Sequence, residues 1–272
     1  MTTGTVIVMG IIAGGTIFIG LPIGRLRARG AGLRALLNAI TVGVLLFLLW
    51  DVLAHAVEPV DAALTAASSG GRSWWPFAGL SALLFIGLAV GLLGLVAYDR
   101  WIAGRPTDEH RPVHGVLRLG APASRLAFLI AVGIGMHNFS EGLAIGQSAA
   151  AGQLQLAVTL VVGFALHNAT EGFGITAPMA ASATRPKWRQ LAVLGVIGGG
   201  PTLIGTLLGS VVVNDALGLV FLALAAGSIV YVLVQLVGVA LKMNRGYVLY
   251  IGILVGLVAG FATDFIISAA GA

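Results

Sequence analysis

Long apolar stretches separated by short polar segments run along almost the whole of this 272-residue chain. A helix needs about 20 mostly apolar residues to cross the hydrocarbon core of a bilayer. Eight stretches meet this length, at residues 4–24, 33–58, 76–98, 125–150, 154–178, 189–213, 216–241 and 247–270. The pattern therefore predicts an all-α polytopic membrane protein in which residues 1–272 form a single transmembrane domain.

Only two of the connections between these spans are long. We expect residues 59–75 to form an outer loop, and residues 99–124 to form a polar cytoplasmic loop with several arginines and prolines. The composition, 58% hydrophobic and 9% charged, excludes an ordinary soluble domain. The chain has no cysteine, which excludes disulfides and thiolate metal ligands.

Basic side chains are confined, with one exception, to the connections that follow spans 1, 3, 5 and 7. Cytoplasmic loops carry the excess of Lys and Arg in membrane proteins, so both termini are predicted to lie outside. The same distribution accounts for the net charge of +5 without a nucleic-acid partner. The first span lacks a preceding basic segment, and we expect it to be retained rather than cleaved. Together with the compact loops, this predicts a multi-pass protein of a prokaryotic inner (plasma) membrane.

The sequence His-Asn-x-x-Glu-Gly occurs twice, 30 residues apart, near the middle of the fourth and fifth predicted spans. Each copy carries an imidazole and a carboxylate into hydrocarbon, which is costly unless the two are paired or bind a metal. Positions i and i+4 share a helix face, so the His and the Glu of each copy point the same way. The six candidate metal ligands are His137, Asn138, Glu141, His167, Asn168 and Glu171.

Consecutive spans are antiparallel, and the two copies therefore reach the same depth from opposite sides. Imidazole nitrogens with carboxylate and amide oxygens form a donor set that suits Zn²⁺, Fe²⁺, Mn²⁺, Co²⁺ or Cd²⁺. Two carboxylates neutralise one dication, and Gly142 and Gly172 are expected to let the two helices approach closely. The alternative is that these groups only form structural hydrogen bonds between helices. Their occurrence as a matched pair favours a metal site between helices 4 and 5 at mid-membrane.

Three further features carry polar or helix-breaking residues into the spans. Asp51, His55 and Glu58 share one face near the outer end of the second span, which indicates an entrance or auxiliary site for the metal or, alternatively, a hydrated face. Asp264 in the last span is compatible with an ion pair, a proton carrier or a near-surface position. Residues 198–201, Gly-Gly-Gly-Pro, predict either a helix break on the substrate path or close packing against a neighbour.

The segments HNFSEGLAIG and HNATEGFGI resemble the fourth and fifth spans of the ZIP (zinc/iron-regulated transporter-like) family. The eight-span layout, the outward termini and the long connection after span 3 are also similar to that family. The resemblance implies uptake of a divalent metal into the cytoplasm, with zinc first and iron, manganese or cadmium as alternatives. It further implies alternating access by movement of one helix bundle against another. The metal is then the substrate, and no organic cofactor is implied.

The chain departs from the family pattern at several positions. Ser140 and Thr170 stand where family members often have proline, and Gly200 stands where many relatives have a glutamate. Gln235 is the candidate weak ligand in a stretch of the seventh span that often carries acidic residues. The resemblance implies a site that can hold two metals, but these departures predict one main position with a weak neighbour.

The resemblance also implies that His110 and His114, in the cytoplasmic loop, take part in sensing or releasing the metal. Two other classes of function are alternatives, an intramembrane metal-dependent hydrolase and a membrane-embedded metal sensor. The hydrolase is disfavoured because the chain has no HExxH motif and no separate base, so we do not predict an enzyme. The expected partners are divalent metal ions and the lipid bilayer, with a second copy of the chain as a further candidate.

Overall fold

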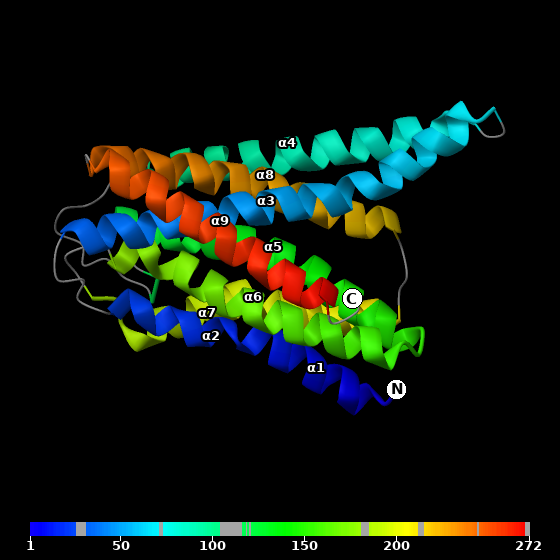
Figure 1. Ribbon diagram of the computed structural model, residues 1–272, viewed down its shortest axis with the longest axis horizontal. Helices are drawn as coiled ribbons and strands as arrows, with labels where there is room; N and C mark the ends of the chain where they lie inside the picture. The colour runs from blue at the N-terminus through cyan, green and yellow to red at the C-terminus, as the bar shows by residue number, and fades with distance from the viewer. Residues whose placement is uncertain are drawn as a thin grey trace.

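The computed structural model describes residues 1–25, 31–70, 73–103, 116, 117, 119, 121–180, 185–211, 215–243 and 245–269. Within these residues every regular element is helical, and eight spans are long and apolar enough to cross a membrane. The all-α polytopic fold expected from the hydropathy pattern is therefore confirmed. The helices run roughly along the long axis of the molecule (Figure 1).

The first span consists of three consecutive pieces, α1 (Thr3–Gly15), α2 (Ile17–Gly20) and the 3₁₀-helix η1 (Leu21–Arg25). Thr16 separates α1 from α2, and its hydroxyl donates a hydrogen bond to the carbonyl of Ala13, a local bond that competes with regular helix geometry. The other spans are single helices: α3 (Ala31–Ser68), α4 (Trp75–Ala103), α5 (Pro122–Ala150), α6 (Leu154–Ala180), α7 (Trp188–Gly209), α8 (Asp215–Lys242) and α9 (Gly246–Ala269).

The helix α3 continues well beyond the end of the predicted second span. The sequence predicts an outer loop from residue 59, whereas the helix runs through Pro59 to Ser68. Alanine, the best helix former, dominates the residues after the proline. Val60 is also buried in a cluster with Leu84 of α4 and Leu219 of α8. The loop prediction is wrong for residues 59–68 because helix propensity and this packing outweigh the polar residues of the segment.

The helices form two bundles. The first, which we call the motif bundle, contains α1, α2, α5, α6 and α7, and the second contains α3, α4, α8 and α9. The bundles meet along a seam where α5 packs on α8 and where α6 packs on α3 and α9. At this seam a Cβ added to Gly133 of α5 would lie 3.4 Å from the Cβ of Ser228 on α8. The two bundles are therefore in close contact along α5 and α8.

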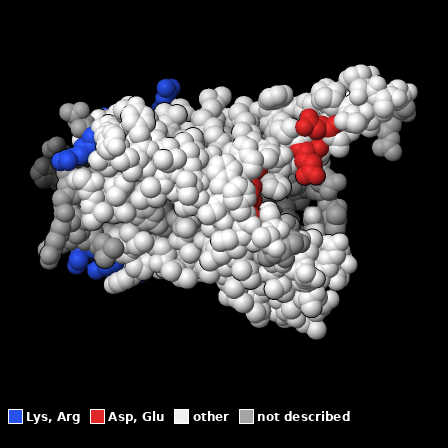
Figure 2. Space-filling view, in the orientation of Figure 1, with Lys and Arg blue, Asp and Glu red and all other residues white. Residues whose placement is uncertain are grey.

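Charge is divided between the two ends of the molecule. Lys and Arg side chains gather at one end, at the left of Figure 2, and the acidic side chains visible in this view lie in the opposite half beside a hollow in the surface. Both termini lie toward that opposite half (Figure 1). The described Lys and Arg side chains in this view and the two termini thus lie in opposite halves of the molecule, in agreement with the distribution of basic residues along the sequence.

A tight turn joins α5 to α6. Gly152 has a φ of 76°, in the left-handed region that favours glycine. Its N–H donates to the carbonyl of Ala149, and the N–H of Gln153 donates to the carbonyl of Ser148, which closes the end of α5. The chain therefore reverses within a few residues, and α5 and α6 lie antiparallel.

Candidate metal-binding site

The two His-Asn-x-x-Glu-Gly copies lie at the midpoints of α5 and α6. His137 is within one residue of the middle of Pro122–Ala150, and His167 is at the middle of Leu154–Ala180. At about 1.5 Å per residue, each copy is roughly 20 Å from either end of its helix. Because the helices are antiparallel and joined by a tight turn, the copies lie at the same level, far from both membrane surfaces.

His137 and Glu141 form a buried ion pair on α5. Nε2 of His137 lies 3.1 Å from Oε1 of Glu141, and both side chains are almost completely buried. The pair has the i, i+4 geometry that the sequence predicts. Burial removes most of the hydration of both groups, and their mutual attraction offsets this loss only in part. The ion pair is therefore not expected to stabilise the folded protein by itself, and a contribution to stability does not explain why these two residues lie in the middle of the membrane.

Glu171 adds a second carboxylate from α6 and is only 1% exposed. Neither of its carboxylate oxygens has a hydrogen-bond partner of good geometry among the described residues. The carboxylate is close enough to Glu141 and His137 to interact with both electrostatically, and Asn138 lies beside it. Buried polar atoms in proteins are normally paired, and a cation placed between these two neighbouring carboxylates would balance their charge.

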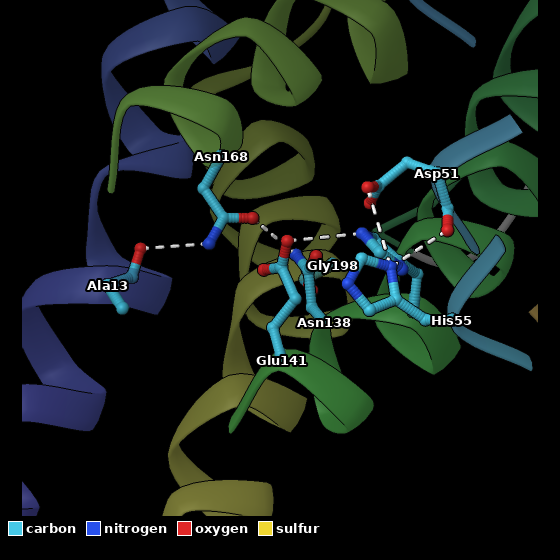
Figure 3. A network of polar contacts seen from close by, with 8 residues as sticks. Ala13, Asp51, His55, Asn138, Glu141, Asn168 and Gly198 are labelled. Atoms are coloured by element: carbon cyan, nitrogen blue, oxygen red, sulfur yellow. Dashed lines mark hydrogen bonds and ion pairs between the residues drawn. The ribbon is translucent and has the colours of Figure 1, made fainter. Parts of the chain in front are cut away.

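The two asparagines link the four spans of the motif bundle (Figure 3). Nδ2 of Asn138 donates to Oδ1 of Asn168 at 2.6 Å and to the carbonyl of Gly198 on α7 at 3.0 Å. Nδ2 of Asn168 donates to the carbonyl of Ala13 on α1 at 3.0 Å. Oδ1 of Asn138 is buried and has no hydrogen-bond partner among the described residues. Of the two amide oxygens, that of Asn138 is the one left available to a ligand.

A second set of polar side chains approaches His137 from α3 and α9. The Nδ1 atom of His55 lies 2.9 Å from the backbone carbonyl of Asp51 and 3.5 Å from its carboxylate (Figure 3). The His55 side chain is 60% exposed and that of Asp51 is 20% exposed. Asp51 is also close enough to His137 and to Asp264 to interact with both electrostatically. Glu58 is exposed on the same helix. The polar side chains of α3 therefore form a series that begins with Glu58 at the surface and ends with Asp51 near the buried His137.

The remaining candidates lie elsewhere or outside the described residues. Gln235 lies beside Tyr231, whose hydroxyl also approaches Asp99. Asp99 in turn pairs with Arg125 at 2.7 Å, about 18 Å along α5 from His137 at the usual helical rise. The structure therefore associates Gln235 with an ion pair near the basic end of the seam. The loop residues His110 and His114 and the side chain of His167 lie outside the described part of the structure.

Among the described side chains, no group of three His, Cys, Asp or Glu residues is spaced to hold a metal ion. The partial set that is present consists of His137, Glu141 and Glu171 with the amide oxygen of Asn138. The sequence predicts that His167 of α6 completes this set, and its side chain lies outside the described part of the structure.

The motif glycines pack against helices other than those the sequence suggests. A Cβ on Gly142 would lie 2.2 Å from the carbonyl oxygen of Thr202 on α7, and one on Gly172 would lie 2.0 Å from that of Ile17 on α2. The prediction that these glycines bring α5 and α6 together is therefore wrong. The glycine follows the histidine by five residues, about 140° around the helix, and so faces away from the polar face.

The Gly-Gly-Gly-Pro segment serves close packing, since α7 is continuous through Pro201. A Cβ on Gly199 would lie 2.2 Å from the carbonyl oxygen of Gly14 on α1. Sequence reasoning missed the role of the Gly198 and Ala13 carbonyls as acceptors for the asparagines. The sequence feature that could have indicated this role is the glycine-rich composition around Ala13 and around Gly198, because glycines allow helix backbones to approach closely.

Eight spans that enclose buried carboxylates at mid-height are the architecture of a polytopic membrane protein. A family model for the ZIP zinc transporters matches residues 106–268, more than half of the chain, and the chain therefore belongs to the ZIP family. The family consists of transporters of divalent metal ions, not enzymes. No curated protein sequence matches the chain. The match covers both motif copies, whereas α1 to α4 lie before it.

Proposed function

We propose that this chain carries zinc, or alternatively iron, manganese or cadmium, into the cytoplasm by alternating access. The observation that supports this most is the set of buried oxygens without hydrogen-bond partners, on Glu141, Glu171 and Asn138, beside the imidazole of His137. Carboxylate oxygens and an imidazole suit a borderline-soft dication, and two carboxylates neutralise its charge in the membrane.

In the proposed mechanism the metal is the substrate and exchanges its hydration shell for protein ligands. The binding residues are His137 and Glu141 from α5 and Glu171 from α6, with Asn138 contributing its amide oxygen. His167 would contribute the matching imidazole from α6. When the metal binds, Glu141 would exchange its contact with His137 for a contact with the ion, and the dication would balance the two buried carboxylates.

We infer that Asp51, His55 and Glu58 guide the ion to this site. Their exposure decreases along α3 from Glu58 and His55 to Asp51, and Asp51 interacts with His137. Acidic groups at the mouth of a low-dielectric cleft raise the local concentration of a cation. Asp264 adds negative charge to the same region.

The two-bundle architecture supports the proposed alternating access. The candidate ligands belong to the motif bundle, whereas Asp51 belongs to the second bundle. A shift of one bundle along the seam would separate the site from the acidic residues of α3 and expose the site to the other side of the membrane.

The basic end is proposed to face the cytoplasm of a prokaryotic cell, and both termini are proposed to face the exterior. Selective labelling from outside of Ser69→Cys, but not Lys187→Cys, would support this orientation, and the reverse would contradict it.

Uptake by purified protein in liposomes tests the proposed function. A panel of Zn²⁺, Fe²⁺, Mn²⁺ and Cd²⁺ is offered outside, and metal inside is measured over time against empty liposomes. We expect saturable accumulation of one or two of these ions. Stoichiometric binding of metal without any accumulation would contradict transport and favour a metal sensor.

A further inference from the structure

We propose that Asp99 and Arg125 form a gate that holds the basic end of the seam closed. The pair connects α4 of the second bundle to α5 of the motif bundle, at the end of the molecule proposed to face the cytoplasm. The gate rests on the proposed function, because it presupposes movement between the bundles, but its residues lie outside the metal site. The ion pair is intact in the structure and would be broken in the state that releases metal.

Each partner of the ion pair is held by its own bundle. Nε of Arg125 donates to Oδ1 of Asp99 at 2.7 Å. In the second bundle, the hydroxyl of Tyr231 on α8 interacts with the Asp99 carboxylate. In the motif bundle, Nε2 of Gln190 on α7 donates to the hydroxyl of Ser124 at 3.0 Å, which fixes the start of α5 beside Arg125. The ion pair therefore joins two anchored groups across the seam.

Side chains, rather than close backbone packing, connect α4 to α5. The close packing of α4 is on α8 and α3, the helices of its own bundle. Across the seam, the ion pair is accompanied by the rings of Tyr98 on α4 and Phe128 on α5, whose centroids lie 6.1 Å apart. Contacts between long side chains can separate and form again while the helix backbones stay intact. This connection therefore suits a contact that opens and closes.

The seam is closed between the metal site and the ion pair. Gly133 of α5 faces Ser228 of α8, and Ser228 is completely buried. Gly133 lies four residues from His137 and eight from Arg125, about 6 and 12 Å along the helix. The described residues therefore close the route from His137 to the basic end, whereas the polar face of α3 leads from the site to the opposite surface.

The exposure of the ion pair suits a contact that breaks in every transport cycle. The two side chains are 24% and 22% exposed, so water can replace each partner when the bundles separate. A fully buried pair would leave uncompensated charges on breaking, at a much larger cost. Charge-assisted hydrogen bonds are strong, but solvent lowers their net contribution at partly exposed positions. Loss of this pair is therefore expected to shift the equilibrium between closed and open states by roughly threefold to tenfold.

The accessibility of a single cysteine tests the gate. Ser228→Cys is the reporter, because the chain has no cysteine and Ser228 lies in the seam between the metal site and the ion pair. A membrane-impermeant maleimide is applied to the full chain in right-side-out and in inverted membrane vesicles, without added metal. In this background, Asp99→Asn and Arg125→Gln are each expected to react roughly threefold to tenfold faster from the basic face. The double variant should react no faster than the faster single variant, because both changes remove the same contact.

Ser124→Ala provides a matched control at the same level of α5. It removes a polar contact within the motif bundle, so the labelling rate should stay at the value of the reporter alone. Equal acceleration by Ser124→Ala would show a general loosening of this helix end and would overturn the gate. If Ser228→Cys does not fold, Val232→Cys replaces it, since Val232 is 2% exposed and lies one turn nearer the basic end of α8.

Two further outcomes would overturn the gate while leaving transport intact. Unchanged labelling in both Asp99→Asn and Arg125→Gln would show that the pair does not hold the seam closed. Multiplied rates in the double variant would show that the two residues act independently. Because labelling needs no metal, absence of metal uptake by wild type would contradict the proposed function separately from the labelling result.

Discussion

At the scale of single residues, the two buried carboxylates have the clearest consequence for the molecule. Glu141 and Glu171 lie close together with little compensation from hydrogen bonds, so the metal-free site holds destabilising charge. A bound dication removes this destabilisation. The stability of the protein should therefore depend on metal through these side chains.

Zinc is expected to stabilise wild type but not Glu171→Gln. A ligand that binds the folded state at about 100 times its Kd adds about 2.7 kcal/mol to the free energy of unfolding. Thermal unfolding in detergent, with and without Zn²⁺, measures the shift. Asp61→Asn, which changes an exposed carboxylate on α3, serves as the control and should keep the full shift. An equal zinc-induced shift in Glu171→Gln would contradict the ligand assignment.

The combined variant Asp51→Asn/His55→Ala is expected to raise the KM for metal uptake about threefold to tenfold, with kcat little changed. The reason is that these residues increase the local cation concentration before binding, whereas the buried ligands remain intact. Initial uptake rates over a range of metal concentrations separate the two constants. Unchanged uptake kinetics would show that this face of α3 is a hydrated surface without a role in transport.

The residue pattern predicts only part of the site. The pairing of His137 with Glu141 follows from helical spacing, because positions i and i+4 always lie on one face. The hydrogen bonds of Asn138 and Asn168 do not follow from spacing. They depend on the carbonyls of Ala13 and Gly198, which reach the site from helices distant in the sequence.

At the scale of helices, glycines determine which spans come into contact. Gly142 packs on the backbone of α7, and its Cβ position lies 2.2 Å from the Thr202 oxygen. The sequence shows where backbones can approach but not which helix approaches. For that reason hydropathy predicts the eight spans while the helix partners of the motif glycines are found only in the fold.

Gly142→Ala is expected to destabilise the protein by about 1–3 kcal/mol, because the added methyl group forces α5 away from α7. Gly94→Ala on α4 is the control, since a Cβ there meets no atom within 4 Å. That change should be neutral or slightly stabilising, because alanine favours the helix. Unfolding in detergent measures both, and equal stabilities of the two variants would contradict the packing described.

A disulfide across the seam should stop transport reversibly. The Cβ separation of 3.4 Å at Gly133 and Ser228 is near the roughly 3.5–4.5 Å of a disulfide, and the chain has no other cysteine. Oxidised Gly133→Cys/Ser228→Cys is expected to lose uptake and regain it on reduction, because α5 is then fixed to α8. Gly10→Cys/Thr206→Cys, within the motif bundle at 3.1 Å, should stay active when oxidised. Full uptake by the cross-linked seam variant would contradict movement between the bundles.

At the scale of the whole molecule, the family match covers residues 106–268, yet the helices before it are shared between the two bundles. α1 and α2 pack on α6 and α7, and α3 and α4 pack on α8 and α9. Each half of the chain thus contributes to both bundles. The hydropathy pattern predicts the number of spans but not this division, which depends on contacts between segments far apart in sequence.

The central claim is that a divalent metal crosses the membrane through the carboxylates between α5 and α6. The most direct measurement compares metal uptake into liposomes by wild type, Glu171→Gln and the control Asp61→Asn, each verified as folded and equally inserted. We expect Glu171→Gln to lose uptake to the level of empty liposomes while Asp61→Asn retains it. Wild-type uptake by Glu171→Gln would show that the metal does not pass through this site.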